Sequence, residues 1–350
     1  MARSKRPGHL LVLRTSAMGD VAMLPHALRA FQSACPDVKV TVATRPLFRP
    51  FFEGLDVDFL DVDTKGAEHS LRGMWRLAAR ARSMGVDAVA DVHGVLRSKA
   101  FRLSMWLHGV RVAHIRKGRL AKWMRMKSGG ESCAAPLRHT VLRYCDVIRR
   151  LGFDFPDPTP AVRLPRPNPM GEKRGVWLGF APFSAQRGKT YPEDLAREAV
   201  ALLAARCERL FIPSAEAPQL SGGGAEAEFA AEMERTHSNV TALWGRVRLA
   251  EERDLIANLD CVVSMDSLVM HLAALVATPV VSVWGATHPS LGFVGYGTSP
   301  EGVLQANLSC RPCSVFGKKP CKWGDYRCLR AITPEMIARR VDALLGRSGE

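Results

Sequence analysis

Short apolar strands alternate with amphipathic helices along most of the chain, and this alternation limits the possible fold more than any other feature. An apolar strand at 10–14 precedes a helix at 20–31, whose apolar residues recur on one face. Further strands of the same type are expected at 38–43, 57–62 and 87–92. Because parallel strands need crossover connections, the pattern predicts a doubly wound parallel sheet.

A proline-rich segment divides this pattern into two halves. Six prolines lie within 156–169 among few apolar residues, which is typical of a domain linker. We therefore expect an α/β protein of two Rossmann-like domains that face each other across a cleft, with domains at 1–165 and 166–332 and a C-terminal helix at 333–350. In the second half, strands are expected at 175–180, 209–212, 262–264 and 280–284.

The charge balance is the one abnormal figure in the composition. Lysine and arginine number 49 against 34 aspartates and glutamates, which leaves a formal net charge of +15 and predicts anionic ligands. The 47% of hydrophobic residues excludes wholesale disorder. No stretch approaches the ~20 apolar residues of a membrane span, and the apolar run at 10–13 is too short for a signal peptide. We expect a cytoplasmic protein.

Four of the nine cysteines crowd near the C-terminus, in the pattern Cys310-x2-Cys313-x7-Cys321-x6-Cys328. The first pair has the spacing of a zinc site, but the second pair does not. Two interpretations stay open: a zinc site, or a thiol-lined structural loop. Either way, neighbouring lysines are expected to stabilise thiolates, namely Lys318, Lys319 and Lys322.

A run of basic residues without any acid extends over 116–127. Such a run is usually a solvated face, but apolar residues including Trp123 are interleaved with its cations, so it could also lie against anionic lipid headgroups. Its cations are Arg116, Lys117, Arg119, Lys122, Arg125 and Lys127.

The loop after the first strand carries a candidate catalytic carboxylate. Gly19 permits a close backbone approach, and Asp20 lies where the helix begins. Asp20 has two interpretations, a simple helix cap or a general base that accepts a proton from a hydroxyl.

Two loops of the second half carry candidate anion-binding groups. Ser184, Gln186 and Lys189 put a hydroxyl, an amide and an ammonium ahead of a helix, a suitable cradle for a diphosphate unless they are merely solvated. After the strand at 262–264, a helix begins close to Asp266, Ser267 and His271. These groups could receive an anion at the helix N-terminus, or serve as a cap and a core histidine.

Several of these stretches, taken together, resemble glycosyltransferase family 9, the family that contains the bacterial lipopolysaccharide heptosyltransferases. They occur in the family's order over nearly the whole chain. The matching segments are 14–21, 91–98, 189–192, 264–273, 283–289 and the cysteine-containing tail through Glu335. The resemblance implies a GT-B fold, with the acceptor bound by the first domain, the nucleotide sugar bound by the second, and the C-terminal helix packed back on the first.

The resemblance also implies an activity: inverting, metal-independent transfer of a heptose from ADP-heptose to the inner core of lipopolysaccharide, without a cofactor. The implied partners are the nucleotide sugar, an anionic glycolipid acceptor and the inner face of the inner membrane, where the enzyme would be peripheral, and no nucleic acid. Two alternatives are a related GT-B transferase with another nucleotide sugar or glycan acceptor, and a basic zinc-containing protein that binds nucleic acid.

Site residues carry over by position. Asp20 resembles the general base, and Lys189 and Ser184 the groups that bind the diphosphate. The family's other donor-binding positions correspond to Glu226, Asp266, Ser267 and His271, with Glu226 on the ribose after the glycines at 222–224. Its acceptor-binding segments correspond to Met18, Gly19, His93 and Arg97.

Overall fold

The computed structural model describes residues 6–128, 136–213 and 224–347, and the chain forms two compact units. The first unit comprises the described residues within 1–118 and 140–159, and the second those within 119–139 and 160–350. Each unit is a parallel sheet covered by helices, so the expected α/β class with two Rossmann-like sheets is confirmed. None of the helices in the described ranges has both the length and the apolar character that a membrane span requires.

The sheet of the first unit has the strand order β3-β2-β1-β4-β5, and every pair in it is parallel. Its central strand is buried along its whole length, which explains why its sequence is apolar rather than alternating. The edge strand β5 was not predicted, because it is short and carries polar residues at both ends. The strands are β1 (His9–Leu13), β2 (Lys39–Thr44), β3 (Asp58–Asp61), β4 (Ala88–Asp91) and β5 (Arg111–His114).

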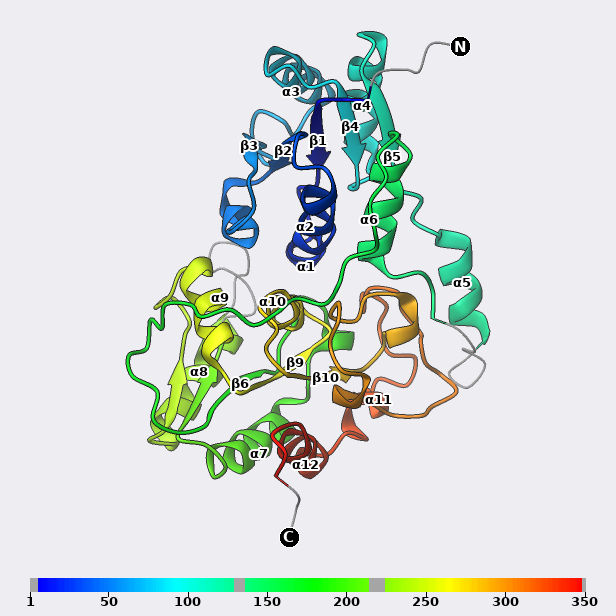
Figure 1. The fold of residues 1–350 in the computed structure, drawn as a ribbon. Coiled ribbons are helices and arrows are strands. Elements are labelled where there is room, and N and C mark those ends of the chain that lie inside the picture. Colours follow the sequence, from blue (N-terminus) through cyan, green and yellow to red (C-terminus); the bar gives the residue numbers. More distant parts are fainter. Residues whose placement is uncertain (1–5, 129–135, 214–223, 348–350) are drawn as a thin grey trace. The chain divides into compact units, whose positions relative to one another are not determined.

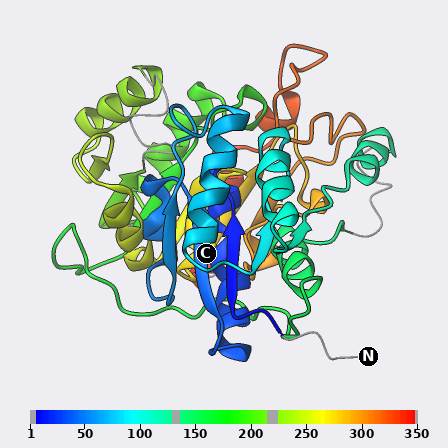
Figure 2. The ribbon, with the colours of Figure 1, turned by 90° about the horizontal axis from the view of Figure 1, so that it is seen from above.

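Helices cover both faces of this sheet. The chain moves one way across the sheet from β1 to β2 and the other way from β3 to β4 and β5, so right-handed crossovers put α2 on one face and α3 with α4 on the other. Helices α2 and α6 pack together, and α3 and α4 lie side by side (Figure 2). The helices are α1 (Met18–Ala22), α2 (Leu24–Ala34), η1 (Pro46–Phe52), α3 (Leu71–Ser83), α4 (Leu96–Leu107) and α6 (Thr140–Arg149).

The sheet of the second unit has the order β11-β10-β9-β6-β7-β8, again parallel. Its four long strands lie where the sequence predicts them. The two outer strands have three residues each, too few for a periodic signal. The strands are β6 (Trp177–Ala181), β7 (Arg209–Ile212), β8 (Val240–Ala242), β9 (Cys261–Met265), β10 (Val280–Trp284) and β11 (Val303–Gln305).

Helix α5, expected in the first domain, clusters with the second unit. The Lys122 ammonium lies 4.2 Å from the ring centroid of Phe293, and this contact joins the helix to the segment after β10. The helices of this unit are α5 (Arg119–Ser128), η2 (Arg187–Lys189), α7 (Glu193–Ala204), α8 (Gly224–Thr236), α9 (Leu249–Asn258), α10 (Leu268–Leu275), η3 (Pro289–Leu291), η4 (Pro300–Gly302), α11 (Arg327–Arg330) and α12 (Pro334–Leu344).

The C-terminal helix α12 differs from its expected position. Thr333 caps it by accepting a hydrogen bond from the Met336 amide, as the sequence indicates. The expectation that this helix packs back on the first domain is corrected, because α12 packs against α7 in the second unit (Figure 1). Its apolar face, which includes Ile337 and Val341, fills the core beneath the second sheet.

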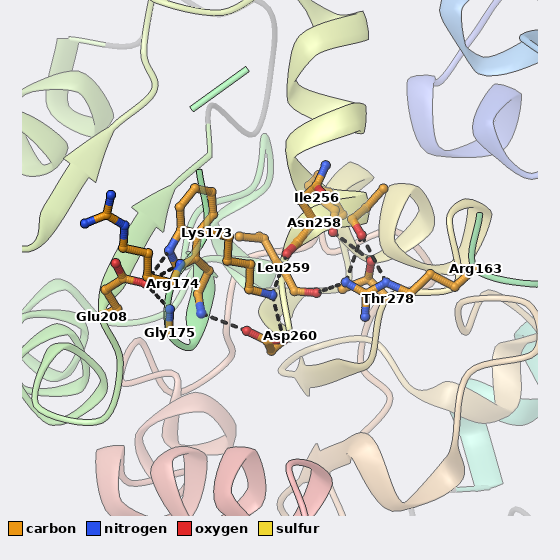
Figure 3. Close-up of polar contacts among 12 residues, drawn as sticks. Arg163, Lys173, Arg174, Gly175, Glu208, Ile256, Asn258, Leu259, Asp260 and Thr278 are labelled. Carbon is orange, nitrogen blue, oxygen red and sulfur yellow. Dashed lines mark hydrogen bonds and ion pairs between the residues drawn. The ribbon is translucent and has the colours of Figure 1, made fainter. Parts of the chain in front are cut away.

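Side-chain bonds hold the proline-rich segment, and the residues between it and β6, against the second unit. The Arg163 guanidinium donates to the carbonyls of Ala257 and Leu259, at 2.8 Å and 2.5 Å. The Lys173 ammonium lies 2.7 Å from Asp260 Oδ1 (Figure 3). These bonds involve the loop that enters β9, at the amino end of the sheet, so the carboxyl ends of β6 and β9 stay available for a site.

A substitution of Ile337 tests whether α12 packs into the hydrophobic core of the second unit. Its side chain is fully buried, so Ile337→Ala is expected to lower the free energy of unfolding by about 2–5 kcal/mol in urea titrations. Arg339→Ala, on the exposed side of the same helix, is the control and is expected to change stability little. Equal, small effects of the two substitutions would contradict the packing described.

Candidate functional site

In the first unit, a partly buried ion pair follows β1. Arg14 donates to the Val92 carbonyl at 2.5 Å and pairs with the Asp20 carboxylate. Burial opposes the charge of Arg14, but Asp20, Tyr144 and Asp91 together outweigh it and the pKa of Arg14 is raised. The Asp20 side chain is 28% exposed while that of Arg14 is 8% exposed, so the carboxylate is the partner that a ligand can reach.

A buried carboxylate shapes the neighbouring loop after β4. Asp91 is fully buried and accepts hydrogen bonds from the amides of His93 and Gly94, at 3.0 Å and 2.8 Å, and from the Ser98 hydroxyl at 2.7 Å. These bonds fix the backbone that carries His93 toward the start of α4. Sequence reasoning marked this segment only through its resemblance and missed Asp91 as its organiser.

His93 is nearly buried, and its Nε2 lies 3.4 Å from the Thr15 hydroxyl. Burial, reinforced by the charges of Arg14 and Lys117, lowers the pKa of His93 to about 3. The imidazole is therefore neutral at physiological pH, and its Nδ1 has no hydrogen-bond partner among the described residues.

The other candidate acceptor residues lie nearby in the same unit. Arg97 lines the same small hollow as His93, and its guanidinium donates to the Thr64 carbonyl at 3.1 Å. Met18 and Gly19 are half-buried in the first turn of α1, directly before Asp20. The structure thus brings the expected first-domain residues to the carboxyl ends of β1 and β4, the edge where open α/β sheets bind ligands.

In the second unit, a second ion pair joins the loops after β6 and β9. Lys189 Nζ lies 3.0 Å from Asp266 Oδ2, and the two side chains are 17% and 6% exposed. The sequence marked both residues separately, and their pairing places one desolvated cation at the carboxyl ends of the two central strands. Asp266 offsets the charge of this cation but does not use all three N–H groups of the ammonium, so the others can still donate to a bound anion.

The loop that carries Lys189 is held by hydroxyl bonds and by a close approach. Thr190 donates its hydroxyl to the Ser184 carbonyl at 2.9 Å and accepts from the Ser184 amide at 3.2 Å. The Ala286 amide donates to the Gly188 carbonyl at 2.9 Å, and a Cβ on Gly188 would lie only 2.9 Å from the Ala286 Cβ. Glycine is therefore required at 188 for this contact.

Helix α10 begins beside the Lys189–Asp266 pair. Ser267 is its N-cap residue, but its hydroxyl lies 3.1 Å from Ser264 Oγ instead of capping the helix. His271 lies in the helix and is buried, 6% exposed. Asp266 and Ser267 thus lie directly before the helix and His271 lies one turn inside it, and the helix N-terminus between them is suitable for an anion.

Glu226 lies in the first turn of α8 and lines a small hollow with aromatic walls. Phe183 and Trp244 belong to the same lining, together with Ile212 from the end of β7. The hollow is too small to enclose a nucleoside, but a carboxylate beside aromatic side chains suits the hydroxyls of a ribose. Of the glycines at 222–224, only Gly224 falls within the described residues.

The four C-terminal cysteines line one cavity of about 920 Å³. Burial raises the pKa of Cys313, although the charge of Lys319 acts in the opposite direction, and burial raises the pKa of Cys328 to about 11. These two thiols are therefore protonated, because burial outweighs the stabilisation of thiolates expected from the lysines. Within the described ranges, no three His, Cys, Asp or Glu residues are placed to hold a metal ion. The fully buried Arg311 instead ties this segment down, with bonds to the carbonyls of Gly285 and Thr287 at 2.6 Å and 2.9 Å.

The cysteine segment also packs against Lys189. The sequence predicted Lys189 as a site residue but did not indicate this contact. Gly317 has a positive φ of 77°, and a Cβ there would lie 2.6 Å from Lys189 Cγ. The backbone of this segment therefore lies directly against the aliphatic stem of Lys189. This close contact with the stem limits the positions that the Lys189 ammonium can reach.

Comparison with known proteins gives a consistent result. The family model of Glycosyltransferase family 9 (heptosyltransferase) matches residues 74–323. The chain is 26% identical to Lipopolysaccharide heptosyltransferase 1 of Pseudomonas aeruginosa over an alignment 364 positions long, which covers 96% of this chain and 98% of that relative. It is 25% identical to the enzyme of the same name from Escherichia coli strain K12, over 82% of this chain and 91% of that one.

Solved structures share the fold. A glycosyl transferase family 9 protein from Veillonella parvula aligns with a TM-score of 0.71 at 16% identity, covering 97% of this chain and 98% of its own. The E. coli heptosyltransferase WaaC, solved with ADP-2-deoxy-2-fluoro heptose, aligns with a TM-score of 0.63 at 20% identity, covering 96% and 99%. The expected GT-B fold class is confirmed by these neighbours.

The depressed pKa of His93 predicts a pH-dependent stability. The unfolded chain binds a proton at His93 near its ordinary pKa of 6.5, whereas the folded chain does so only near 3. Between these values the unfolded state binds more protons, so the free energy of unfolding falls as the pH falls. We expect a loss of about 2 kcal/mol between pH 7 and pH 5 from this residue.

Urea unfolding of wild type and His93→Asn at both pH values measures this loss. The variant is expected to lose about 2 kcal/mol less than wild type between the two pH values. His69→Asn, an exposed histidine in the same unit, is the control and is expected to keep the wild-type pH dependence. A His93→Asn protein with an unchanged pH slope would mean that His93 is protonated in the folded state.

Proposed function

Because the chain belongs to glycosyltransferase family 9, we propose that this glycosyltransferase moves a heptose from ADP-heptose to the inner core of lipopolysaccharide. The relatives named above are lipopolysaccharide heptosyltransferases, and one neighbour was solved with an ADP-heptose analogue. The observation that carries the proposal is the Lys189–Asp266 pair, a desolvated cation that suits a diphosphate leaving group. Family membership also favours the transferase over the nucleic-acid-binding hypothesis.

Asp20 is proposed as the general base. An acceptor hydroxyl attacks the anomeric carbon of the heptose, its proton passes to the Asp20 carboxylate, and the bond from that carbon to the ADP oxygen breaks. One carboxylate on the attacking side is what an inverting displacement needs. The pair with Arg14 supports this role, because it keeps the carboxylate oriented while leaving part of it accessible.

The leaving ADP gains negative charge as its bond to the sugar breaks. Lys189, the Ser184 hydroxyl and the N-terminal end of α10 at Ser267 are proposed to neutralise that charge, so no divalent metal is required and chelation by EDTA is expected to leave turnover intact. Asp266 then has a positioning role, since it holds the Lys189 ammonium 3.0 Å away. His271 belongs to the same helix and is proposed as a further donor contact.

The nucleoside and the acceptor are proposed to use different units. Glu226, with Phe183 and Trp244 beside it, is proposed to bind the ribose next to a packed adenine. In the first unit, the acceptor contacts are proposed to be His93 with the residues around it, namely Met18, Gly19 and Arg97. A neutral His93 can bond a sugar hydroxyl, and the Arg97 guanidinium suits a phosphorylated glycolipid.

Such an acceptor is held at the inner face of the inner membrane, so we propose a cytoplasmic enzyme that associates peripherally with that surface. The alternative keeps the fold and changes the sugar or the acceptor. A panel of nucleotide sugars, assayed for release of nucleoside diphosphate, separates the two. Release only from a sugar other than heptose would overturn the proposed donor.

Removing the base is expected to separate chemistry from donor binding. Asp20→Asn should lower the rate of heptose transfer by roughly 10²–10⁴-fold while the affinity for ADP stays near wild type, because the base contacts the acceptor and not the nucleotide. Transfer assays and calorimetric titration with ADP measure the two quantities. Asp37→Asn, an exposed aspartate of the same unit, is the control. Loss of ADP affinity with turnover preserved would contradict the role.

A substitution of Lys189 is expected to lower both the rate of heptose transfer and the affinity for ADP. Lys189→Gln should weaken ADP binding and slow transfer by roughly 10²–10³-fold, because the cation contacts the diphosphate before and during departure. Arg187→Gln is a matched control in the same loop, where the exposed guanidinium lies 5.6 Å from the Tyr326 ring centroid. If both variants kept wild-type ADP affinity, the diphosphate would have to bind elsewhere.

A further inference from the structure

The outer surface of the α3–α4 layer in the first unit is apolar, aromatic and cationic, and the proposed chemistry does not use it. Both helices lie on the same face of the sheet, next to each other (Figure 2). Their inner sides share one core, in which Leu77 of α3 and Phe101 and Met105 of α4 are fully buried. The helices are therefore well packed on one side, and the exposed residues described next belong to the other.

Helix α4 exposes a stripe of large apolar side chains. Leu96, Leu103 and Trp106 are 73%, 50% and 64% exposed, and Leu107 is 57% exposed. Leu107 lies four residues after Leu103, and Leu103 lies seven after Leu96, so the three leucines share one side of the helix, and Trp106 lies three residues after Leu103 beside them. Single exposed leucines are ordinary, but four large apolar residues on one side of a twelve-residue helix indicate a surface that is covered by a partner.

Helix α3 continues this character. Leu71 and Trp75 are 59% and 41% exposed, one helical turn apart. The two helices together thus expose two tryptophans, a residue type that prefers the boundary between lipid and water.

The charges of the same surface have one sign. Neither α3 nor α4 contains an aspartate or glutamate. Other cations of the two helices are engaged: Arg80 with Glu68 at 3.3 Å and Arg102 with Asp91 at 3.0 Å. The exposed cations without an ion pair to any described residue are Arg72, Arg76 and Lys99.

We infer that the α3–α4 surface docks on an anionic lipid bilayer, with its apolar residues among the headgroups and its cations on lipid phosphates. Exposed tryptophans and leucines interleaved with unpaired cations match the chemistry of that interface. A nucleic acid would use the cations but not the leucines, and it is an outcome of the test below. The inference rests on the proposed function in one respect only: the proposed function supplies the reason for docking, which is to reach a lipid-linked acceptor.

The position of the surface suits that purpose. Helix α4 begins at Leu96, directly after the loop that holds His93 and beside Arg97, the proposed acceptor contacts. Docking through α4 would therefore bring this loop close to the headgroups. The basic run at 116–127 also exposes apolar residues, namely Leu120, Trp123 and Met124. It is a weaker candidate because its cations are partly engaged within the chain: Lys122 is buried against Phe293, and the Lys127 ammonium lies 4.2 Å from the Trp123 ring centroid.

Vesicle sedimentation tests the inference without any substrate. Wild-type protein is expected to bind vesicles of phosphatidylglycerol and phosphatidylcholine, and to bind pure phosphatidylcholine much more weakly. The triple variant R72Q/R76Q/K99Q should lose roughly a hundredfold in partitioning, since each cation near an anionic surface contributes about a fivefold effect. The matched control R235Q/R248Q/R339Q removes the same charge from exposed positions of the second unit and should bind as wild type does.

A second variant separates lipid from other polyanions. L96S/L103S/L107S keeps every charge, and it is expected to lose binding to the vesicles while its affinity for heparin is unchanged. The double substitution V162S/L164S, at exposed apolar residues of the proline-rich segment, is the control. Circular dichroism of each variant checks that it is folded.

Three results would overturn the inference. They are wild-type protein that fails to bind anionic vesicles, a cation triple variant that binds as tightly as wild type, and a leucine triple variant that retains full vesicle binding. The last would indicate a general polyanion surface, as for nucleic acid. Failure of the proposed function is distinguishable, because release of nucleoside diphosphate from ADP-heptose in solution is measured separately and does not depend on docking.

Discussion

In both units, an ion pair lies beyond the carboxyl end of a central strand of the sheet. Arg14 pairs with Asp20 in the first unit, and Lys189 with Asp266 in the second. Removing one partner of such a pair would leave a poorly solvated charge, which is costly, so the loops are held where the pairs require. In the second unit the sheet supplies this arrangement, because the parallel strands β6 and β9 end at the same edge and bring Lys189 and Asp266 together from loops distant in sequence.

The central strands and the loops after them could be predicted from the sequence, because a strand buried on both faces is a continuous apolar run. The outer strands β5, β8 and β11 could not, since they are short or end in polar residues. Helix α12 was predicted with its cap, but an amphipathic pattern says which side of a helix is buried and not against which sheet. That information is in the core formed by Ile337 and Val341 with α7, which is a property of the folded chain.

The cysteine segment shows why spacing alone was insufficient there. The spacing allowed either a zinc site or a structural loop, and it drew attention to the thiols. The bonds that organise the segment come instead from Arg311, whose guanidinium donates to carbonyls of the loop after β10. Asp91 has the same kind of role in the first unit. A buried charged residue that bonds mainly to backbone has no sequence pattern of its own, because its partners are amides and carbonyls of any residue.

The excess of positive charge is used in two physically different ways. Lys189 is largely buried and held by Asp266, so its ammonium has a fixed place that a single diphosphate of defined geometry can exploit. Arg72, Arg76 and Lys99 are exposed on long flexible stems, and their positions are not fixed by any ion pair to the described residues. A lipid surface is a fluid array of phosphates, so a local positive field is sufficient there and a fixed geometry would bring no gain. For this reason, the acids that orient Arg14 and Lys189 are useful beside the proposed reaction, whereas an acid on α3 or α4 would only weaken the field that docking requires.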